Sequence, residues 1–497
     1  MNEECVRIRL EPLSVEVEIP RGTPLTSVLA VHGVEFPCAG ASACGGCRVR
    51  VLSGTLPVGN ADRRVFSALE LAEGWRLACQ ARAETPLVLD CGQWHMDVLA
   101  GNRELTGSAR SGLGIAIDLG TTTIAAQTID LATGSVLAIE TLLNPQAHFG
   151  ADIMSRIQAV LSGADLTTPI RLALAGIIAQ LAAGRAEEVV EVVLVGNTVM
   201  HHLFAGLDVK PLSHVPFQSP HLEAQLFAPS DLGWPLPPSC RIRMERCLGG
   251  FVGSDILAGI VAVGMTHSEK PVALIDLGTN GEIVIGSRDR IVCASTAAGP
   301  AFEAGSIRMG MRAATGAIAH VALENGELHV VTVGGVLPRG ICGSGLVDAA
   351  AVGLKCGAIL PSGRIANGAK TFPVSGPVVL AQSDIRELQL AKAAIASGFR
   401  LLLTHLGMCA GDLESIYLAG AFGNYVSVES AIEIGLIEAP AEIVRTAGNT
   451  ALHGAKLLLL SPAAPDWPQV EHLSLASEPD FEDEYVGCMA LCKCEDS

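Results

Sequence analysis

The pentapeptide IDLGT occurs twice in the chain, at residues 117–121 and again at residues 275–279. Each copy closes an apolar run, and a second apolar run follows each. The four runs are GLGIAIDLG (112–120), TIAAQTID (123–130), VALIDLG (272–278) and EIVIGS (282–287). Continuous apolar runs of this length are typical of buried strands in an α/β protein. A strand–turn–strand unit that recurs after about 158 residues predicts two similar half-domains.

The turns between these strands carry residues suited to a nucleotide. Glycine lets the backbone approach a phosphate, and hydroxyl groups and backbone N–H groups supply donors. The phosphate-binding candidates are Gly120, Thr121, Thr122 and Thr123 in the first turn, and Gly278, Thr279, Asn280 and Gly281 in the second. Asp118 and Asp276 are the catalytic candidates, because two carboxylates that face across a cleft can hold hydrated Mg2+ beside a polyphosphate.

A third loop of small residues, LAGAFG at 418–423, follows another apolar strand. Its Gly420, Ala421 and Gly423 suit the close approach of a flat adenosine. The three segments together resemble the superfamily of acetate and sugar kinases, heat-shock chaperones and actin, in which they form two phosphate loops and an adenosine loop. The resemblance implies an ATPase domain that binds ATP and Mg2+.

A cysteine motif lies nearer the N-terminus: Cys38-AGASA-Cys44-GG-Cys47, with Cys79 further along the chain. Four thiolates are the ligand set of a 2Fe–2S cluster, and the small residues between the first three let a loop wrap closely around it. Structural zinc is less favoured, because it prefers two Cys-x2-4-Cys pairs and only one is present. The spacing between Cys38 and Cys44 resembles the adrenodoxin-like branch of the ferredoxins, over residues 1–95.

These motifs divide the chain into five predicted parts. They are a 2Fe–2S ferredoxin-like domain (1–95), a linker (96–112), a first ATPase half (113–270), a second ATPase half (271–470) and an acidic, cysteine-containing tail (471–497). The predicted fold class is α/β: an α+β ferredoxin-like domain is followed by a duplicated ATPase domain of the actin and sugar-kinase type. Because the tail is polar and strongly acidic, we expect it to be solvated and partly disordered.

The amino-acid composition argues against some classes of binding partner. A net charge of −18 argues against nucleic acid and against anionic membrane surfaces, both of which need clustered Lys and Arg. No basic region precedes an apolar run at the N-terminus, and no apolar stretch is long enough to span a bilayer. We therefore expect a cytoplasmic protein without membrane contact. Of the fifteen cysteines, those scattered outside the two clusters of the sequence are expected to be small buried hydrophobes.

A ferredoxin-like domain joined to this ATPase type resembles the reductive activators of corrinoid proteins. The stretches that carry the resemblance are NPQAHFGADIMSRI (144–157), AAGPAFEAGSIRMGMRA (297–313), RGICGSGLVD (339–348), DIRELQLAKAAI (384–395) and LAGAFGNYVSVESAIEIGLI (418–437). It implies ATP-dependent transfer of one electron from the cluster to the inactive cobalt(II) form of a corrinoid methyl-transfer protein, restoring cobalt(I). The implied partners are that corrinoid protein and an upstream electron donor, a reductase or ferredoxin. The question of whether the protein forms a homodimer stays open.

Two other functions remain open from the sequence. A small-molecule kinase with a redox-sensing domain would phosphorylate an acceptor without needing the cluster. A nucleotide-gated electron carrier for another low-potential enzyme is ranked lower, because this chain has its own complete set of 2Fe–2S ligands.

Two features depart from the family. The connection between the two functional parts is short, and the tail cysteines Cys488, Cys492 and Cys494 lack a fourth partner, which favours reactive or idle thiols over a metal site. Ser306 is a candidate for contact with the cobalt face, and the alternative is that it caps the following turn.

Overall fold

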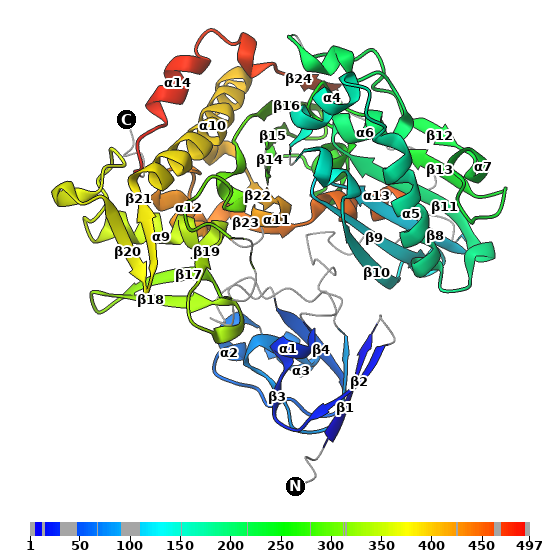
Figure 1. The fold of residues 1–497 in the computed structure, drawn as a ribbon, viewed down its shortest axis with the longest axis horizontal. Coiled ribbons are helices and arrows are strands. Elements are labelled where there is room, and N and C mark those ends of the chain that lie inside the picture. Colours follow the sequence, from blue (N-terminus) through cyan, green and yellow to red (C-terminus); the bar gives the residue numbers. More distant parts are fainter. Residues whose placement is uncertain are drawn as a thin grey trace.

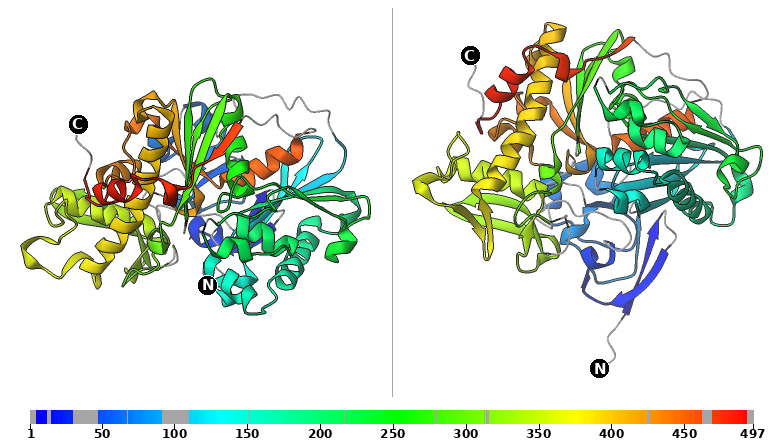
Figure 2. Two further views of the ribbon diagram at one scale, coloured as in Figure 1. Left: turned by 90° about the horizontal axis from the view of Figure 1, so that it is seen from above. Right: turned by 45° about the horizontal axis from the view of Figure 1, so that its top comes forward.

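The computed structural model describes residues 5–11, 15–29, 47–66, 68–90, 110–150, 152–215, 217–278, 280–311, 313, 316–423, 426–461 and 469–492. The predicted site residues Cys38, Cys44 and Thr279 lie outside these ranges. Figures 1 and 2 show a small N-terminal unit beside two larger α/β halves. No helix among the described residues has the length and apolar character needed to cross a membrane.

The N-terminal unit is built on a five-stranded sheet in the order β2-β1-β7-β4-β5. Its strands are β1 (Cys5–Glu11), β2 (Val15–Pro20), β4 (Arg48–Ser53), β5 (Trp75–Leu77) and β7 (Leu87–Asp90), and a separate pair consists of β3 (Thr23–Pro24) and β6 (Arg82–Ala83). Its helices are α1 (Leu25–Leu29), α2 (Asp62–Val65) and α3 (Ala68–Ala72). Along β1, Val6, Ile8 and Leu10 are buried between exposed residues, which is the alternation expected of a half-buried strand.

The first half of the ATPase-like part contains a six-stranded sheet in the order β10-β9-β8-β11-β13-β12. Its strands are β8 (Leu113–Leu119), β9 (Thr123–Asp130), β10 (Val136–Leu143), β11 (Val189–Gly196), β12 (Gln225–Phe227) and β13 (Arg241–Met244). Its helices are α4 (Ile153–Leu161), α5 (Thr167–Ala182), α6 (Thr198–Ala205) and α7 (Pro229–Leu232). The central strand β8 pairs antiparallel with β9 and parallel with β11.

The second half repeats this arrangement in a sheet of order β23-β22-β14-β15-β16-β24. Its strands are β14 (Val272–Leu277), β15 (Gly281–Gly286), β16 (Arg290–Thr296), β22 (Ser415–Ala419), β23 (Val444–Gly448) and β24 (Gln469–His472). The central strand β14 pairs antiparallel with β15 and parallel with β22, as β8 does with β9 and β11. The predicted α/β fold with a duplicated core is therefore confirmed.

Smaller elements complete the second half. Its helices are α9 (Gly343–Lys355), α10 (Gln382–Leu406), α11 (Gly420–Gly423), α12 (Val428–Glu433) and α14 (Phe481–Gly487). Two small sheets contain β17 (Ala317–Glu324), β18 (Glu327–Thr332) and β19 (Gly340–Ile341) in one and β20 (Thr371–Ser375) and β21 (Val378–Ala381) in the other.

Two helices, α8 (Ser254–Ala262) and α13 (Thr450–Leu460), join the two halves. Leu257 on α8 packs with the first sheet, while Ile260 on the same helix packs with the second. The two helices also pack on each other at a close crossing. A Cβ added to Gly454 of α13 would lie 1.9 Å from the Ala258 carbonyl oxygen of α8. Only a residue without a side chain fits at this crossing.

The C-terminal segment is folded over residues 471–492, so the expectation of partial disorder is wrong there, while most of its side chains are exposed or half-buried, as expected of a solvated segment. Strand β24 pairs with β16, and α14 packs on α10. Leu491 is fully buried in the core of the second half, and Cys488 is buried in a smaller apolar cluster on α10. The sparse apolar residues of the segment are used for packing, and Arg400 of α10 forms an ion pair with Glu484 over 3.3 Å.

A matched pair of helical glycines tests the crossing of α8 and α13. Gly454→Ala should lower the free energy of unfolding by about 1–3 kcal/mol, because the new methyl group overlaps the backbone of α8. Gly176→Ala on α5, where an added Cβ meets nothing within 4 Å, should raise it by about 0.5–1 kcal/mol. Urea unfolding of the two variants would contradict this packing if both moved in the same direction.

Candidate functional site

The turn after β8 is supported by polar side chains from residues 144–157. The Asn144 amide donates to the Gly120 carbonyl over 2.9 Å, and the Arg156 guanidinium donates to the Thr121 carbonyl over 2.5 Å. Arg156 is fully buried, and burial lowers its pKa to about 10. A buried cation needs hydrogen-bond partners. The Thr121 carbonyl of the turn supplies one of them, and Gln146 and the Gly150 carbonyl supply others, so Arg156 fixes the conformation of the turn.

The first turn depends on glycine at position 120 and on a hydrogen bond from the residue that caps α6. A Cβ at Gly120 would lie 2.3 Å from the Thr123 carbonyl oxygen, so the turn requires glycine there. The Thr121 hydroxyl accepts a hydrogen bond from the Asn197 amide over 2.8 Å. Thr122 is half-buried and Thr123, the first residue of β9, is exposed. The predicted residues of the first turn therefore lie together at the end of β8.

Four acids, which we call the acid cluster, meet where the two halves join: the half-buried Asp118, Asp255 and Asp276 and the buried Glu282. Asp118 is on β8, Asp276 on β14, Asp255 in the first turn of α8, and Glu282 is paired with Asp276 across β14 and β15. The sequence predicted Asp118 and Asp276 as a facing pair, and the structure brings them close enough to repel one another.

Burial is the main cause of raised pKa values in the acid cluster. It raises the pKa of Asp118 to about 6, although the hydrogen bond from Asn449 lowers it. Burial and then repulsion from Asp118 raise the pKa of Asp276 to about 7. For Asp255, burial followed by repulsion from Asp118 and Asp276 raises the pKa to about 8. Burial, followed by repulsion from Asp255 and Asp276, raises the pKa of Glu282 well above its ordinary value.

The acid cluster suits a hydrated divalent cation. Among the described residues, no group of three or more His, Cys, Asp or Glu side chains is arranged to bind a metal directly. The four carboxylates nevertheless lie close together with like charge, and no lysine or arginine contributes to their pKa shifts. Mg2+ keeps several of its waters and is often held by one or two carboxylates. The donor set therefore fits Mg2+ bound through water.

Three helices begin around the acid cluster. Asn197 accepts from the Met200 amide and caps α6, and Asn449 accepts from the Leu452 amide over 2.8 Å and caps α13. The Asn449 amide also donates to the Asp118 carboxylate over 2.9 Å. The third helix, α8, begins directly after Gly253. The free N–H groups and dipoles of helix N-termini attract anions such as phosphate.

The second turn and the third loop meet beside Asp276. Gly420 has φ +84°, and a Cβ there would lie 2.5 Å from the Asp276 Oδ1 atom. In the turn, the Gly278 amide donates to the Asn280 carbonyl over 3.1 Å. The missing side chain of Gly281 makes room for Ile395 of α10, which is a packing role that the sequence did not predict.

The remaining residues of the third loop follow β22. Gly423 lies at the end of α11, where a Cβ would contact the Leu418 backbone at 3.1 Å. Ala421 belongs to the same short helix, and its side chain is outside the described part of the structure.

Cys47 and Cys79 come together in the N-terminal unit. Cys47 directly precedes β4 and is buried, and Cys79 lies in the turn after β5 and is half-buried. The Ala78 amide donates to the Cys47 carbonyl over 2.9 Å, and both cysteines belong to an apolar cluster with Phe66. Two thiols on neighbouring segments under an apolar cover fit half of a four-thiolate ligand set.

Most of the other described cysteines fall into two groups; outside these groups, Cys342 is buried and Cys492 is half-buried. Burial raises the pKa of four of them to about 11 or 12, as expected of packing residues: Cys240, Cys247, Cys293 and Cys488. The expectation of burial is wrong for three others, which are exposed: Cys5, Cys356 and Cys409.

Comparison with known proteins identifies the family. Family models match a 2Fe-2S iron-sulfur cluster binding domain at 8–84, the RACo middle region at 113–268, and the C-terminal ASKHA domain of RACo at 270–497. The corrinoid activation enzyme RamQ of Eubacterium limosum is 36% identical over 412 residues, which cover 75% of this chain and 69% of the relative. The chain belongs to the RACo family of reductive activators of corrinoid proteins.

Two further relatives of this family agree with that assignment. The [Co(II) methylated amine-specific corrinoid protein] reductase of Methanosarcina barkeri is 26% identical over 414 residues, covering 75% of this chain and 76% of the relative. A solved structure titled reductive activator for corrinoid, iron-sulfur protein is 27% identical, with a TM-score of 0.67 and 98% of each chain covered. The recognised family and its enzyme class are thereby confirmed.

The sequence missed several residues around the acid cluster. Asp255 was not predicted because its segment, VGSDILAG, is not a glycine-rich turn that follows a strand, which is the pattern that identified Asp118 and Asp276. Asn197 and Asn449 each stand before a threonine at a helix start, and that capping pattern was visible but was not connected to Asp118. The 144–157 segment was noted for its family likeness, and its structural reason is the support that it gives to the first turn.

Substituting one acid tests the electrostatic cost of the acid cluster. The pKa of Asp255 is about 8 in the folded protein, so between about pH 4 and pH 8 the folded state keeps a proton that the unfolded chain releases. Stability of the metal-free protein should therefore fall as the pH rises through this window. Asp255→Asn removes the effect and should stabilise the metal-free protein at pH 8 by about 1–3 kcal/mol more than at pH 5.5.

Thermal unfolding in the presence of a chelator measures this difference. Asp289→Asn is the control, since its carboxylate is 80% exposed and outside the acid cluster, and it should shift stability equally at both pH values. Equal shifts for Asp255→Asn would show that Asp255 is already ionised in the folded protein at pH 5.5.

Proposed function

We propose that this protein uses ATP to transfer one electron from its 2Fe–2S cluster to the cobalt(II) form of a corrinoid methyl-transfer protein, restoring cobalt(I). The observation that carries the proposal is the joining, in one chain, of a ferredoxin-like unit to a duplicated ATPase-like core with the acid cluster at its junction. Its relatives named as a corrinoid activation enzyme and a corrinoid protein reductase support the choice of partner.

The acid cluster gives the nucleotide site its proposed chemistry. Asp118 and Asp276 would hold Mg2+ through water, and the cation would supply positive charge to neutralise the nucleotide's phosphates. The phosphates lie against the two turns, formed by Gly120, Thr121, Thr122 and Thr123 and by Gly278, Thr279, Asn280 and Gly281. The adenosine lies against Gly420, Ala421 and Gly423, where the left-handed backbone of Gly420 keeps the surface beside Asp276 free of a side chain.

Asp255 is the proposed general base for the attacking water. It is placed in the first turn of α8, within electrostatic range of Asp118 and Asp276. A general base works best with a pKa near the operating pH, and burial raises the pKa of Asp255 to about 8. Positive charge brought by Mg2+ would lower that value and leave the carboxylate ready to accept a proton.

The ferredoxin-like unit supplies the electron. Cys38, Cys44, Cys47 and Cys79 would hold a 2Fe–2S cluster, which carries one electron at a time. Clusters of this type have potentials near about −400 mV, and each ~59 mV by which cobalt(I) is the stronger reductant costs a factor of ten in equilibrium constant. ATP can help only if it favours one state of the complex over another, so the two states must bind the partner with different affinity.

Ser306 stays a candidate for contact with the cobalt face. It is exposed and has φ 60°, a backbone conformation that residues with side chains seldom adopt. The segment is tied to the start of α10, because the Arg308 amide donates to the Asp384 carboxylate over 2.9 Å. A polar side chain presented on a fixed backbone is suited to contact with a partner.

Reduction of a corrinoid protein tests the proposal directly. The reduced protein with Mg2+ and ATP should convert cobalt(II) to cobalt(I), followed by absorbance, and a non-hydrolysable ATP analogue should give little product. Asp276→Ala should abolish ATP hydrolysis and leave the visible spectrum of the cluster unchanged, because Asp276 lies in the second half and not in the ferredoxin-like unit. Phosphorylation of an added metabolite, with no response to any corrinoid protein, would support the kinase alternative instead.

A matched pair of cysteine variants tests the cluster ligands. Cys79→Ser should lower the iron content and bleach the visible spectrum, because serine is a poor replacement for a thiolate ligand. Cys356→Ser should leave two irons per chain, since Cys356 is exposed at the end of α9 in the second half. Iron and sulfide analysis of anaerobic preparations measures both, and a full iron complement in Cys79→Ser would remove Cys79 from the ligand set.

A further inference from the structure

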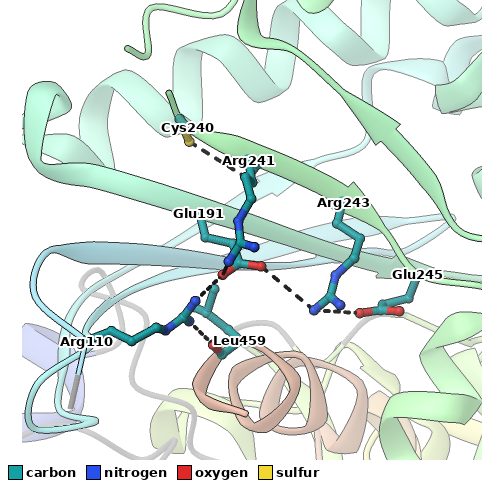
Figure 3. A network of polar contacts seen from close by, with 7 residues as sticks. All are labelled: Arg110, Glu191, Cys240, Arg241, Arg243, Glu245 and Leu459. Atoms are coloured by element: carbon teal, nitrogen blue, oxygen red, sulfur yellow. Dashed lines mark hydrogen bonds and ion pairs between the residues drawn. The ribbon is translucent and has the colours of Figure 1, made fainter. Parts of the chain in front are cut away.

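An ion-pair network fixes the chain where it enters the first half, just before β8 (Figure 3). The Arg110 guanidinium donates to Glu191 of β11 over 2.5 Å and to the carbonyl oxygen of Leu459, at the C-terminal end of α13. Glu191 is only 8% exposed, and it also forms an ion pair with Arg241 over 3.0 Å. Arg110 therefore ties the chain that comes from the ferredoxin-like unit to α13.

The opposite end of α13 reaches the acid cluster. Asn449 caps the helix through the Leu452 amide and donates to the Asp118 carboxylate over 2.9 Å. With 11 residues, α13 is about 16 Å long. One helix thus contacts a predicted Mg2+-binding carboxylate at one end and the anchor of the entering chain at the other.

Close packing makes α13 suited to transmit a displacement along its length. A Cβ at Gly114 of β8 would lie 2.6 Å from the Leu459 side chain, and Gly454 lies directly on the α8 backbone. The Gln127 amide of β9 donates to the Leu452 carbonyl over 3.2 Å. A helix packed this tightly moves as a unit, because its neighbours leave no room for local bending.

We propose that α13 couples the nucleotide site to the ferredoxin-like unit, with Asn449 as the contact at the site and Arg110 as the anchor of the entering chain. Water molecules of a bound Mg2+ need acceptor positions on Asp118 and compete there with the Asn449 amide. Nucleotide binding therefore weakens the hold of Asn449 on Asp118, lets α13 shift, and loosens the bond between Leu459 and Arg110. The inference rests on the proposed function only for the nucleotide site.

Thermodynamic reciprocity makes the coupling measurable at the nucleotide site. If nucleotide binding loosens the Arg110 anchor, then breaking the anchor must favour nucleotide binding by the same factor. Arg110→Gln should tighten binding of Mg2+ with a non-hydrolysable ATP analogue by about fivefold or more in the full-length, iron-loaded protein. Isothermal titration calorimetry measures the dissociation constant.

A double-mutant cycle tests whether the coupling passes through Asn449. In an Asn449→Ala background, Arg110→Gln should change the dissociation constant by less than about twofold, because the contact with Asp118 is already lost. Arg241→Gln is the matched control. It removes an arginine from the same Glu191 carboxylate but no contact with α13, so nucleotide affinity should stay within about twofold of the wild type.

Arg110→Lys is a second test variant, to be used if Arg110→Gln does not fold. Lysine keeps a positive charge beside Glu191 but has a single nitrogen in place of the two that reach Glu191 and Leu459, so it should tighten binding in the same direction. Unchanged affinity in both folded variants, or additive effects in the cycle, would overturn the coupling.

The outcomes separate this inference from the proposed function. If the effects of the Arg110 and Asn449 substitutions on nucleotide affinity are non-additive but the protein reduces no corrinoid partner, the coupling stands and the proposed function is wrong. Wild-type protein that binds no nucleotide would reject both.

Discussion

The structure depends on one constraint, which is that four acidic side chains of like charge lie together at the junction of the two halves. Asp118, Asp255, Asp276 and Glu282 come from four different elements and meet at the junction of the two halves, where burial opposes their ionisation. Folding alone gives no reason to gather them, since an unpaired buried charge is costly. In the proposed function a bound cation would remove that cost, and the acid cluster marks the place in the ATPase-like core where it would lie.

The surrounding elements are arranged around the acid cluster. Central strands β8 and β14 each end near an aspartate, and α6, α8 and α13 each begin close by, where the positive ends of helix dipoles favour anions. Arg156, a buried cation that contacts the first turn, donates to the Thr121 and Gly150 carbonyls, and no lysine or arginine contributes to the pKa shifts of the acids. Since α8 and α13 also join the two halves, any change at the acid cluster acts on the elements that hold the halves together.

Patterns local in sequence predicted much of this. The repeated IDLGT motif predicted the duplicated core and placed Asp118 and Asp276 at matching positions, and the cysteine spacing predicted the ferredoxin-like unit. Contacts distant in sequence could not be predicted, because no pattern links Asn449 to Asp118 or Arg110 to Leu459. The order of the tail was not predicted, because the prediction rested on the charge of the segment and not on its few apolar residues. Those residues pack on α10 and the core of the second half.

Proton release on nucleotide binding tests the central claim most directly. Asp118, Asp255 and Asp276 have pKa values of about 6, 8 and 7, so near neutral pH part of the acid cluster is protonated, and bound Mg2+ must displace those protons. Calorimetric titration of Mg2+ and an ATP analogue at pH 7, in buffers of different ionisation enthalpy, should reveal the release of about one proton per site. Identical binding enthalpies in all buffers would contradict the account.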